Sequence, residues 1–136
     1  MIIMKTLYLF TDGGARGNPG PAAIGIVLKD PEGNVLKKKG EKIGRATNNQ
    51  AEYTALIKGL KVAHEYKPQK LICLMDSSLA VNQLNGRFKI KNTGLRKLSF
   101  EVRKAIQKLP YVEFRYIPRE KNKEADKLLN QAFSNS

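Results

Sequence analysis

The chain has 136 residues, of which 41% are hydrophobic, and its 25 Lys and Arg residues outnumber 12 Asp and Glu residues, for a formal net charge of +13. This length suits one hydrophobic core, and we expect a single domain over residues 1–136. No apolar run is long enough to span a membrane and no signal-peptide pattern precedes the first predicted strand, so a cytoplasmic protein without a membrane partner is expected. The lone Cys73 excludes a disulfide framework or a cysteine-based zinc site.

The positive charge is unevenly distributed along the chain. Between residues 86 and 104 a single acid, Glu101, accompanies Arg87, Lys89, Lys91, Arg96, Lys97, Arg103 and Lys104. Such a surplus favours nucleic acid as the partner. A thermophile's lysine-rich surface, or a surface adapted for solubility, explains the total charge but not its clustering.

The first predicted strand leads into the segment TDGGARGNPGP, residues 11–21. Leu7–Phe10 is apolar on both faces, which predicts a central strand covered on both sides. Asp12 follows at the end of this strand, where a buried carboxylate needs a hydrogen bond, an ion pair or a metal. We expect Gly13 and Gly14 to let the chain turn and to let another group approach the backbone closely. A turn signal with no further function is the alternative for Asp12.

Two further strands are predicted at residues 22–29 and 35–43, joined by the turn sequence DPEGN. With the first strand they form an antiparallel meander. The lysine triplet at residues 37–39 predicts that the third strand is a solvated sheet edge.

The pattern then becomes helical. Thr47 and Gln50 have the spacing of a capping box, and apolar residues recur at helical spacing to about residue 66. The apolar run Leu71–Met75 predicts a buried parallel strand that ends at Asp76. Further helices are predicted over residues 77–84, 94–109 and 122–133, and a last strand over residues 111–117. This order predicts an α/β fold with a five-stranded mixed sheet, three antiparallel strands and then two parallel ones, and helices on both faces.

Four carboxylates are expected at one edge of this sheet. Right-handed crossovers place the strand that ends at Asp76 beside the strand that ends at Asp12, about 4.8 Å away. Glu52 and Asp126 each lie near the start of a predicted helix, at the border of its apolar face. Taken singly, Asp76 is also explained as a helix N-cap, and Glu52 and Asp126 as first-turn acids that the helix dipole stabilises. Together they need counter-ions, and carboxylates without His or Cys favour Mg²⁺ or Mn²⁺.

Four segments, in order and spacing, resemble the type 1 ribonuclease H family: TDGGARGNPGPAAIG, TNNQAEYTAL, LMDSSLAVNQLNGRFKIKN and REKNKEADKLLNQA. The resemblance covers essentially the whole chain and implies a ribonuclease H-like fold. It implies an endonuclease that cuts the RNA strand of RNA–DNA hybrids and leaves 5′-phosphate and 3′-hydroxyl ends. In it Asp12, Glu52, Asp76 and Asp126 match the catalytic acids that hold two Mg²⁺ ions, with Mn²⁺ as a substitute. One ion is expected to activate water and the other to stabilise the leaving oxygen.

The resemblance also implies contacts to the substrate. The backbone at Gly17 and Asn18, together with Asn48 and Asn49, resembles the part that contacts 2′-hydroxyl groups in the minor groove of the hybrid. Helix capping is the alternative for the two asparagines. Phe88 resembles an aromatic residue that packs on the DNA strand, with core burial as its alternative. The remaining expected contacts are Ser78, Arg87, Lys89 and Lys91.

The sequence departs from the family pattern in the loop before the last helix, where many relatives carry a histidine. Here the loop reads PREK, and Arg119 or Glu120 is the expected substitute. This version resembles a shorter branch of the family, and the chain lacks room for the basic protrusion of longer members. Ser78 stands where glutamine is common, which weakens one expected RNA contact. The only histidine, His64, is expected to be an ordinary surface residue.

Other functions remain open at this point. A broader nuclease also cleaves double-stranded RNA, and a hybrid-binding module keeps the fold but has lost catalysis. A transposase-like or resolvase-like nuclease shares the fold and metal chemistry but lacks TNNQAEYTAL and the Gly-Asn-Pro-Gly loop. We expect a monomer.

Overall fold

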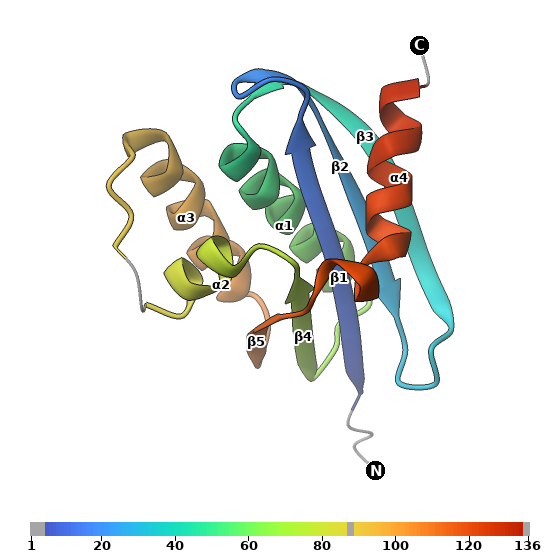
Figure 1. Cartoon of the computed structure of the whole chain (residues 1–136). Coiled ribbons are helices and arrows are strands. Elements are labelled where there is room, and N and C mark those ends of the chain that lie inside the picture. Colours follow the sequence, from blue (N-terminus) through green and yellow to red (C-terminus); the bar gives the residue numbers. More distant parts are fainter. Residues whose placement is uncertain (1–4, 87–88, 135–136) are drawn as a thin grey trace.

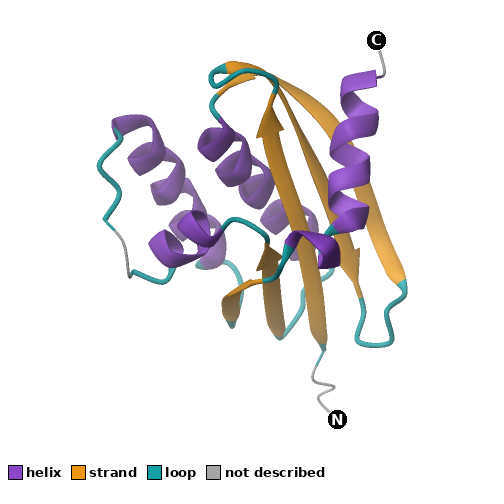
Figure 2. Cartoon of the chain, viewed as in Figure 1, coloured by secondary structure: helices purple, strands orange, loops and turns teal. Residues whose placement is uncertain are grey.

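The computed structural model describes residues 5–86 and 89–134. Its elements, in chain order, are β1 (Thr6–Ala15), β2 (Gly20–Lys29), β3 (Val35–Ala46), α1 (Asn48–Glu65), β4 (Lys70–Met75), α2 (Ser78–Leu84), α3 (Thr93–Ile106), β5 (Val112–Tyr116), a short 3₁₀ helix (Arg119–Lys121) and α4 (Lys123–Ser134). The five strands form one sheet in the order β3-β2-β1-β4-β5 (Figures 1 and 2). Pairing is antiparallel among β1, β2 and β3 and parallel among β1, β4 and β5. The predicted fold class is confirmed.

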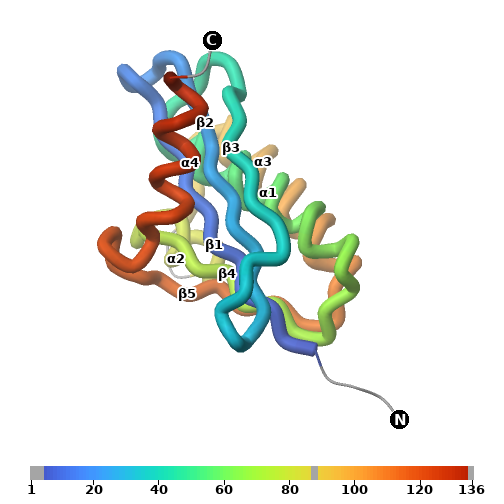
Figure 3. Tube along the Cα trace, turned by 90° about the vertical axis from the view of Figure 1, so that its right-hand side faces the viewer, coloured from blue at the N-terminus to red at the C-terminus, as the bar shows by residue number. Residues whose placement is uncertain are grey.

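Helices cover both faces of the sheet, as the edge-on view shows (Figure 3). The larger core lies between the sheet and α1, where Leu9, Ile26 and Leu56 are fully buried, and α3 packs against α1. α4 lies on the other face, mainly over β2 and β3. Because α4 is displaced from β1, Tyr8 and Phe10 on that face are only half-buried. The predicted cover on both sides of the first strand is therefore complete only toward α1.

Two glycines set the close approach of the helices to the sheet. A Cβ atom at Gly13 would lie 2.2 Å from the carbonyl oxygen of Ala51 in α1, and one at Gly25 would lie 1.9 Å from the carbonyl oxygen of Ala125 in α4. These distances exclude a side chain at either position. Both helices therefore bring their N-terminal halves directly against the central strands.

The predicted turn at Gly13 and Gly14 is wrong. Both residues belong to β1, which pairs with β2 as far as Ala15, and the chain turns only at residues 16–19. The reason is that the antiparallel ladder with β2 continues beyond the last parallel pair with β4, which is Thr11 with Met75. Asp12 is thus a strand residue, one position past the end of the parallel ladder. The predicted close approach of another group to the glycine backbone is found at Gly13, which lies against Ala51 of α1.

The helix starts follow their predicted caps. Thr47 Oγ1 accepts a hydrogen bond from Gln50 N at 3.1 Å, and Gln50 Oε1 accepts one from Thr47 N at 2.9 Å, so the capping box is confirmed. Ser77, and not Asp76, is the N-cap of α2. Lys37, Lys38 and Lys39 are exposed on β3, the predicted sheet edge.

α3 ends at Ile106 instead of the predicted residue 109. There the amide groups of Lys108 and Leu109 donate to Ala105 O and Ile106 O, three residues back. These tighter turns end the helix before Pro110. Among the described residues, no helix combines the length and apolar character that crossing a membrane requires.

Candidate active site

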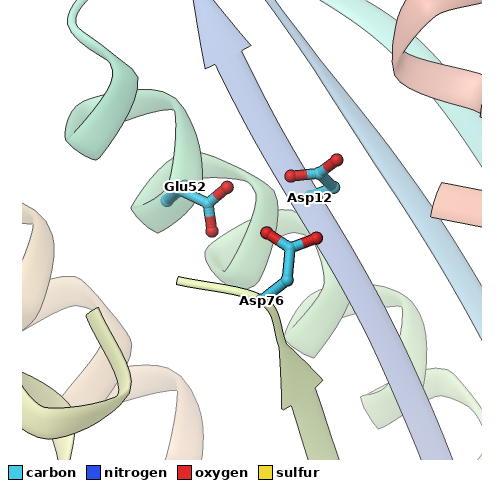
Figure 4. A group of neighbouring side chains, drawn as sticks. All are labelled: Asp12, Glu52 and Asp76. Carbon is cyan, nitrogen blue, oxygen red and sulfur yellow. The ribbon is translucent and has the colours of Figure 1, made fainter. Parts of the chain in front are cut away.

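Three acids from three elements meet at the C-terminal end of the parallel strands. Asp12 lies on β1, Glu52 on α1, and Asp76 directly follows β4. One carboxylate oxygen from each lies within 4.8 Å of those from the other two. Figure 4 shows the three carboxylates directed toward one another. Glu52 lies 40 residues after Asp12 in the sequence, and Asp76 lies 24 residues after Glu52. The connections between the strands thus bring distant acids together.

Asp126 lies on the same cleft but outside this compact group. It is a half-buried acid in the first turn of α4. The cleft has a volume of about 350 Å³ and is lined by Asp12, Gly13, Gly14, Asn48, Asn49, Glu52, Asp76, Ser77, Arg119, Asp126 and Leu129. All four predicted acids therefore face one opening. Glu52 lies beyond the first turn of α1, so a role as a first-turn acid does not explain its position.

Glu52 and Asp76 are held by hydrogen bonds from the protein. Gly13 N donates to Glu52 Oε1 at 3.0 Å, and Asn122 Nδ2 donates to Asp76 Oδ2 at 2.9 Å. The second oxygen of Glu52, Oε2, is buried and has no hydrogen-bond partner among the described residues. An unpaired buried carboxylate oxygen is unfavourable, and coordination to a cation is one way to satisfy it.

Burial makes two of these carboxyl groups hard to ionise. The pKa of Asp12 is raised from its usual 3.8 to about 7: burial is the largest cause and the charges of Asp76 and Asp126 add to it, whereas the hydrogen bonds with Glu52 and Gly13 oppose the shift. Burial, followed by the charge of Asp12, also raises the pKa of Glu52 well above its usual 4.5. Acids with raised pKa values that face one cleft indicate a site where added positive charge stabilises the ionised forms.

The donor set fits a hard divalent cation. The grouped ligand atoms are all carboxylate oxygens. Mg²⁺ and Mn²⁺ prefer oxygen ligands of this kind, whereas zinc is more often held by His and Cys. The orphaned Glu52 Oε2 and the raised pKa of Asp12 agree with this assignment.

Of the residues expected to contact the minor groove, Asn48 and Asn49 line the cleft, whereas Gly17 and Asn18 lie in the turn after β1. Asn48 Oδ1 accepts a hydrogen bond from Ala15 N at 2.8 Å, and Asn18 Oδ1 accepts one from Asn48 N at 3.0 Å. These bonds join the turn after β1 to the start of α1. Gly17 has a φ of 94°, which favours glycine, and Asn49 lines the cleft beside Asn48. The side chains of Asn18 and Asn48 each also carry an NH₂ group that can donate to a ligand.

The other described residues that were predicted to contact the substrate, Ser78, Lys89 and Lys91, are not among those that line the acidic cleft. Ser78 is exposed at the start of α2 and accepts a hydrogen bond from Asn82 Nδ2 at 3.2 Å, whereas its neighbour Ser77 lines the cleft. Lys89 and Lys91 are exposed between α2 and α3. Two further predicted contacts, Arg87 and Phe88, lie outside the described residues.

Arg119 and Glu120, the two residues expected to replace the loop histidine, face different depressions on the surface. Arg119 lines the acidic cleft, whereas Glu120 lines a different depression with Phe10 and Lys29. Of the pair, the structure therefore brings only Arg119 to the acids. His64 is exposed on α1, as expected of a surface residue.

Sequence reasoning missed Asn122. Its side chain is 1% exposed, and its Nδ2 atom donates both to Thr11 O at 3.0 Å and to Asp76 Oδ2 at 2.9 Å. The only signal in the sequence is an asparagine at the predicted start of the last helix, a position where asparagine is common for local reasons. Nothing local indicates a contact to a residue 46 positions away.

Comparison with known proteins identifies the family of this chain. The model of the reverse transcriptase-like family matches residues 10–132. A protein of Mycobacterium tuberculosis named as bifunctional is 42% identical over 122 residues, which make up 89% of this chain and 34% of that protein. The chain thus spans about a third of the length of this relative.

Two solved structures match over nearly the full length of both chains. RNase H1 of the halophilic archaeon Halobacterium salinarum has a TM-score of 0.93 and 37% identity, with coverage of 96% of this chain and 99% of that one. LC11-RNase H1, solved in complex with an RNA/DNA hybrid, has a TM-score of 0.91 and 40% identity, with coverage of 94% and 96%. The chain belongs to the type 1 ribonuclease H family.

Proposed function

We propose that this chain is a metal-dependent endoribonuclease that hydrolyses the RNA strand of RNA–DNA hybrids. The observation that carries the proposal is the group of Asp12, Glu52 and Asp76, whose carboxylate oxygens lie within 4.8 Å of one another in an open cleft. The hybrid as substrate is supported by LC11-RNase H1, which is 40% identical and was solved with an RNA/DNA hybrid.

Mg²⁺ is the proposed cofactor, and Mn²⁺ is its proposed substitute. Asp12, Glu52 and Asp76 would hold the metal, and Asp126 extends the acidic set along the same cleft. Two ions bound by these acids would supply the positive charge that activates an attacking water and stabilises the leaving 3′-oxygen, so that the products carry 5′-phosphate and 3′-hydroxyl ends. The protein's own part is to keep the carboxylates oriented, which the hydrogen bond from Gly13 N does for Glu52.

Recognition of RNA is proposed at the rim formed by Asn18, Asn48 and Asn49. The 2′-hydroxyl groups that distinguish RNA from DNA face the wide, shallow minor groove of a hybrid. A rim that is fixed by hydrogen bonds between the β1–β2 turn and α1 can present amide groups to them without large rearrangement.

We propose that Arg119 acts through its positive charge and not by proton transfer. It lines the cleft beside the acids, so its guanidinium can attract the phosphate at the cleavage point. Because arginine stays protonated in proteins, it does not take up a proton as a histidine in this loop would. Its role is therefore electrostatic.

The test is a cleavage assay with labelled RNA–DNA hybrid, double-stranded RNA and duplex DNA, each with Mg²⁺, Mn²⁺ or EDTA. We expect cleavage of the RNA strand of the hybrid with either metal and none with EDTA. Asp12→Asn should abolish it, whereas Glu32→Gln, an exposed acid in the β2–β3 turn, should retain it. Binding without cleavage would identify a hybrid-binding module, comparable cleavage of double-stranded RNA a broader nuclease, and comparable cleavage of duplex DNA a recombinase-like enzyme.

A further inference from the structure

Asn122 connects three of the segments that form the acidic cleft. Its side chain reaches Thr11 on β1 and Asp76 after β4, and its backbone oxygen accepts a hydrogen bond from Asp126 N at 3.1 Å. Its backbone N–H in turn donates to Arg119 O at 2.9 Å. We propose that Asn122 is a positioning residue that fixes Asp76 against β1 and sets where α4 begins, and so determines how tightly the acids hold a divalent metal.

The two side-chain hydrogen bonds define the orientation of the carboxamide. Both partners, the carbonyl oxygen of Thr11 and Oδ2 of Asp76, only accept, so the NH₂ group must face them. A side chain without two donor hydrogens on one nitrogen cannot make this pair of contacts. At 1% exposure, water does not readily replace them.

Asp76 depends on this support because the sheet ends before it. The last β4 residue paired with β1 and β5 is Met75, so the backbone of Asp76 lies outside both parallel ladders. Asp76 is not the cap of α2 either, since Ser77 has that role. Side-chain partners of metal ligands keep them in place, and loss of such a partner typically lowers metal affinity by about 10- to 100-fold.

The same residue also places the fourth acid. α4 begins at Lys123, directly after Asn122, and Asp126 N donates to Asn122 O as the first helical hydrogen bond of this segment. A shift of Asn122 therefore moves Asp76 through the side chain and Asp126 through the backbone. Its effect on metal binding should exceed the effect of losing one ordinary buried hydrogen bond.

This inference rests on the proposed function, and metal binding without substrate tests it. We would measure Mg²⁺ and Mn²⁺ affinity by calorimetry for the wild type, Asn122→Ala and Asn122→Asp, with circular dichroism to verify the fold. About a tenfold or greater loss of affinity is expected for Asn122→Ala. A larger loss is expected for Asn122→Asp, which keeps the shape of the side chain but directs a carboxylate at Asp76. In cleavage assays, raising the metal concentration should restore kcat, while KM for the hybrid changes little.

Two comparisons separate positioning from a general loss of stability. Asn130→Ala is the matched control, because Asn130 is an exposed asparagine on the same helix whose Nδ2 donates to a backbone oxygen, Asp126 O, at 3.0 Å. It should bind metal as the wild type does. In an Asp76→Asn background, Asn122→Ala should lower affinity further by a smaller factor than in the wild type, since its partner at Asp76 is already altered.

A folded Asn122→Ala or Asn122→Asp protein with wild-type metal affinity would overturn the inference, and so would a full additional loss in the Asp76→Asn background. If Asn122→Ala does not fold, Asn122→Asp decides the question alone. Failure of the proposed function would be seen separately, as a wild-type protein that neither binds metal nor cleaves the hybrid.

Discussion

The backbone N–H of Gly13 donates to Oε1 of Glu52 at 3.0 Å, across a contact too close for any side chain on Gly13. The same glycine thus sets the distance between β1 and α1 and the orientation of an acid in the cleft. Gly13→Ala should therefore affect both stability and metal binding. Overpacking of this kind typically destabilises a protein by about 1–3 kcal/mol.

The measurement for Gly13 is a urea unfolding curve together with a Mg²⁺ titration. Gly14→Ala is the matched control, because a Cβ atom there would lie 3.7 Å from its nearest neighbour, an ordinary contact with Leu129. We expect Gly13→Ala to lose stability and metal affinity, and Gly14→Ala to lose little of either. Equal behaviour of the two variants would contradict the close contact between β1 and α1.

Without metal, the protein should become less stable as the pH rises from about 5 to 8. Asp12 has a pKa of about 7 in the folded protein and 3.8 as its usual value, so the folded state binds more protons than the unfolded state between these values. Stability then falls with increasing pH, by up to about 4 kcal/mol for a shift of this size. The raised pKa of Glu52 acts in the same direction.

Three acids with lowered pKa values affect stability only at lower pH. The hydrogen bonds from Asn34, Lys58 and Arg115 lower the pKa values of Asp30, Glu41 and Glu113, respectively, so the stability that these acids contribute is lost only below about pH 4.5. Urea unfolding in EDTA at pH 5, 6, 7 and 8 gives the measurement. Asp12→Asn should flatten the dependence and be more stable than the wild type at pH 8. A wild-type protein whose stability rises steadily over this range would rule out the assigned cause.

Metal affinity should increase as the pH rises from 6 to 8. A cation binds the ionised carboxylates, so it must displace the protons that the raised pKa values of Asp12 and Glu52 retain. Calorimetry in buffers of different ionisation enthalpy would count the protons released. Proton release near zero at pH 6 would place the metal away from these two acids.

Binding of the hybrid should weaken steeply with salt. The logarithm of affinity is expected to fall with the logarithm of salt concentration by about 0.7–0.9 for each phosphate that is neutralised. Lys89→Ala and Lys91→Ala should each reduce this slope by about one, whereas Lys37→Ala on the edge strand serves as the control. A slope near zero for the wild type would remove the basic segment from substrate binding.

The sequence predicted those features that local pattern determines. Alternation and helical periodicity located the strands and helices, and the capping box at Thr47 marked the start of α1 to the residue. The four acids were recognisable because each lies in a segment that resembles the family motif. The proximity of Asp12 and Asp76 followed from the order of the strands, since parallel neighbours end at the same edge of a sheet.

What the sequence did not predict depends on contacts between distant segments. Gly13 and Gly14 have the composition of a turn, but pairing with β2 keeps them in the strand. Asn122 has the local signature of a helix start, and its contact to Asp76 exists only in the folded chain. Arg119 and Glu120 are adjacent, and only the 3₁₀ turn of their loop decides which one lines the cleft.

The most direct test of the metal site is a crystal of this protein soaked in Mn²⁺ and measured for anomalous scattering. The proposed metal site predicts anomalous peaks within coordination distance of carboxylate oxygens of Asp12, Glu52 and Asp76. These peaks should disappear in Asp12→Asn and remain in Glu32→Gln. A wild-type map with no peak at these three acids, from crystals at a pH above 7 with Mn²⁺ in excess, would contradict it.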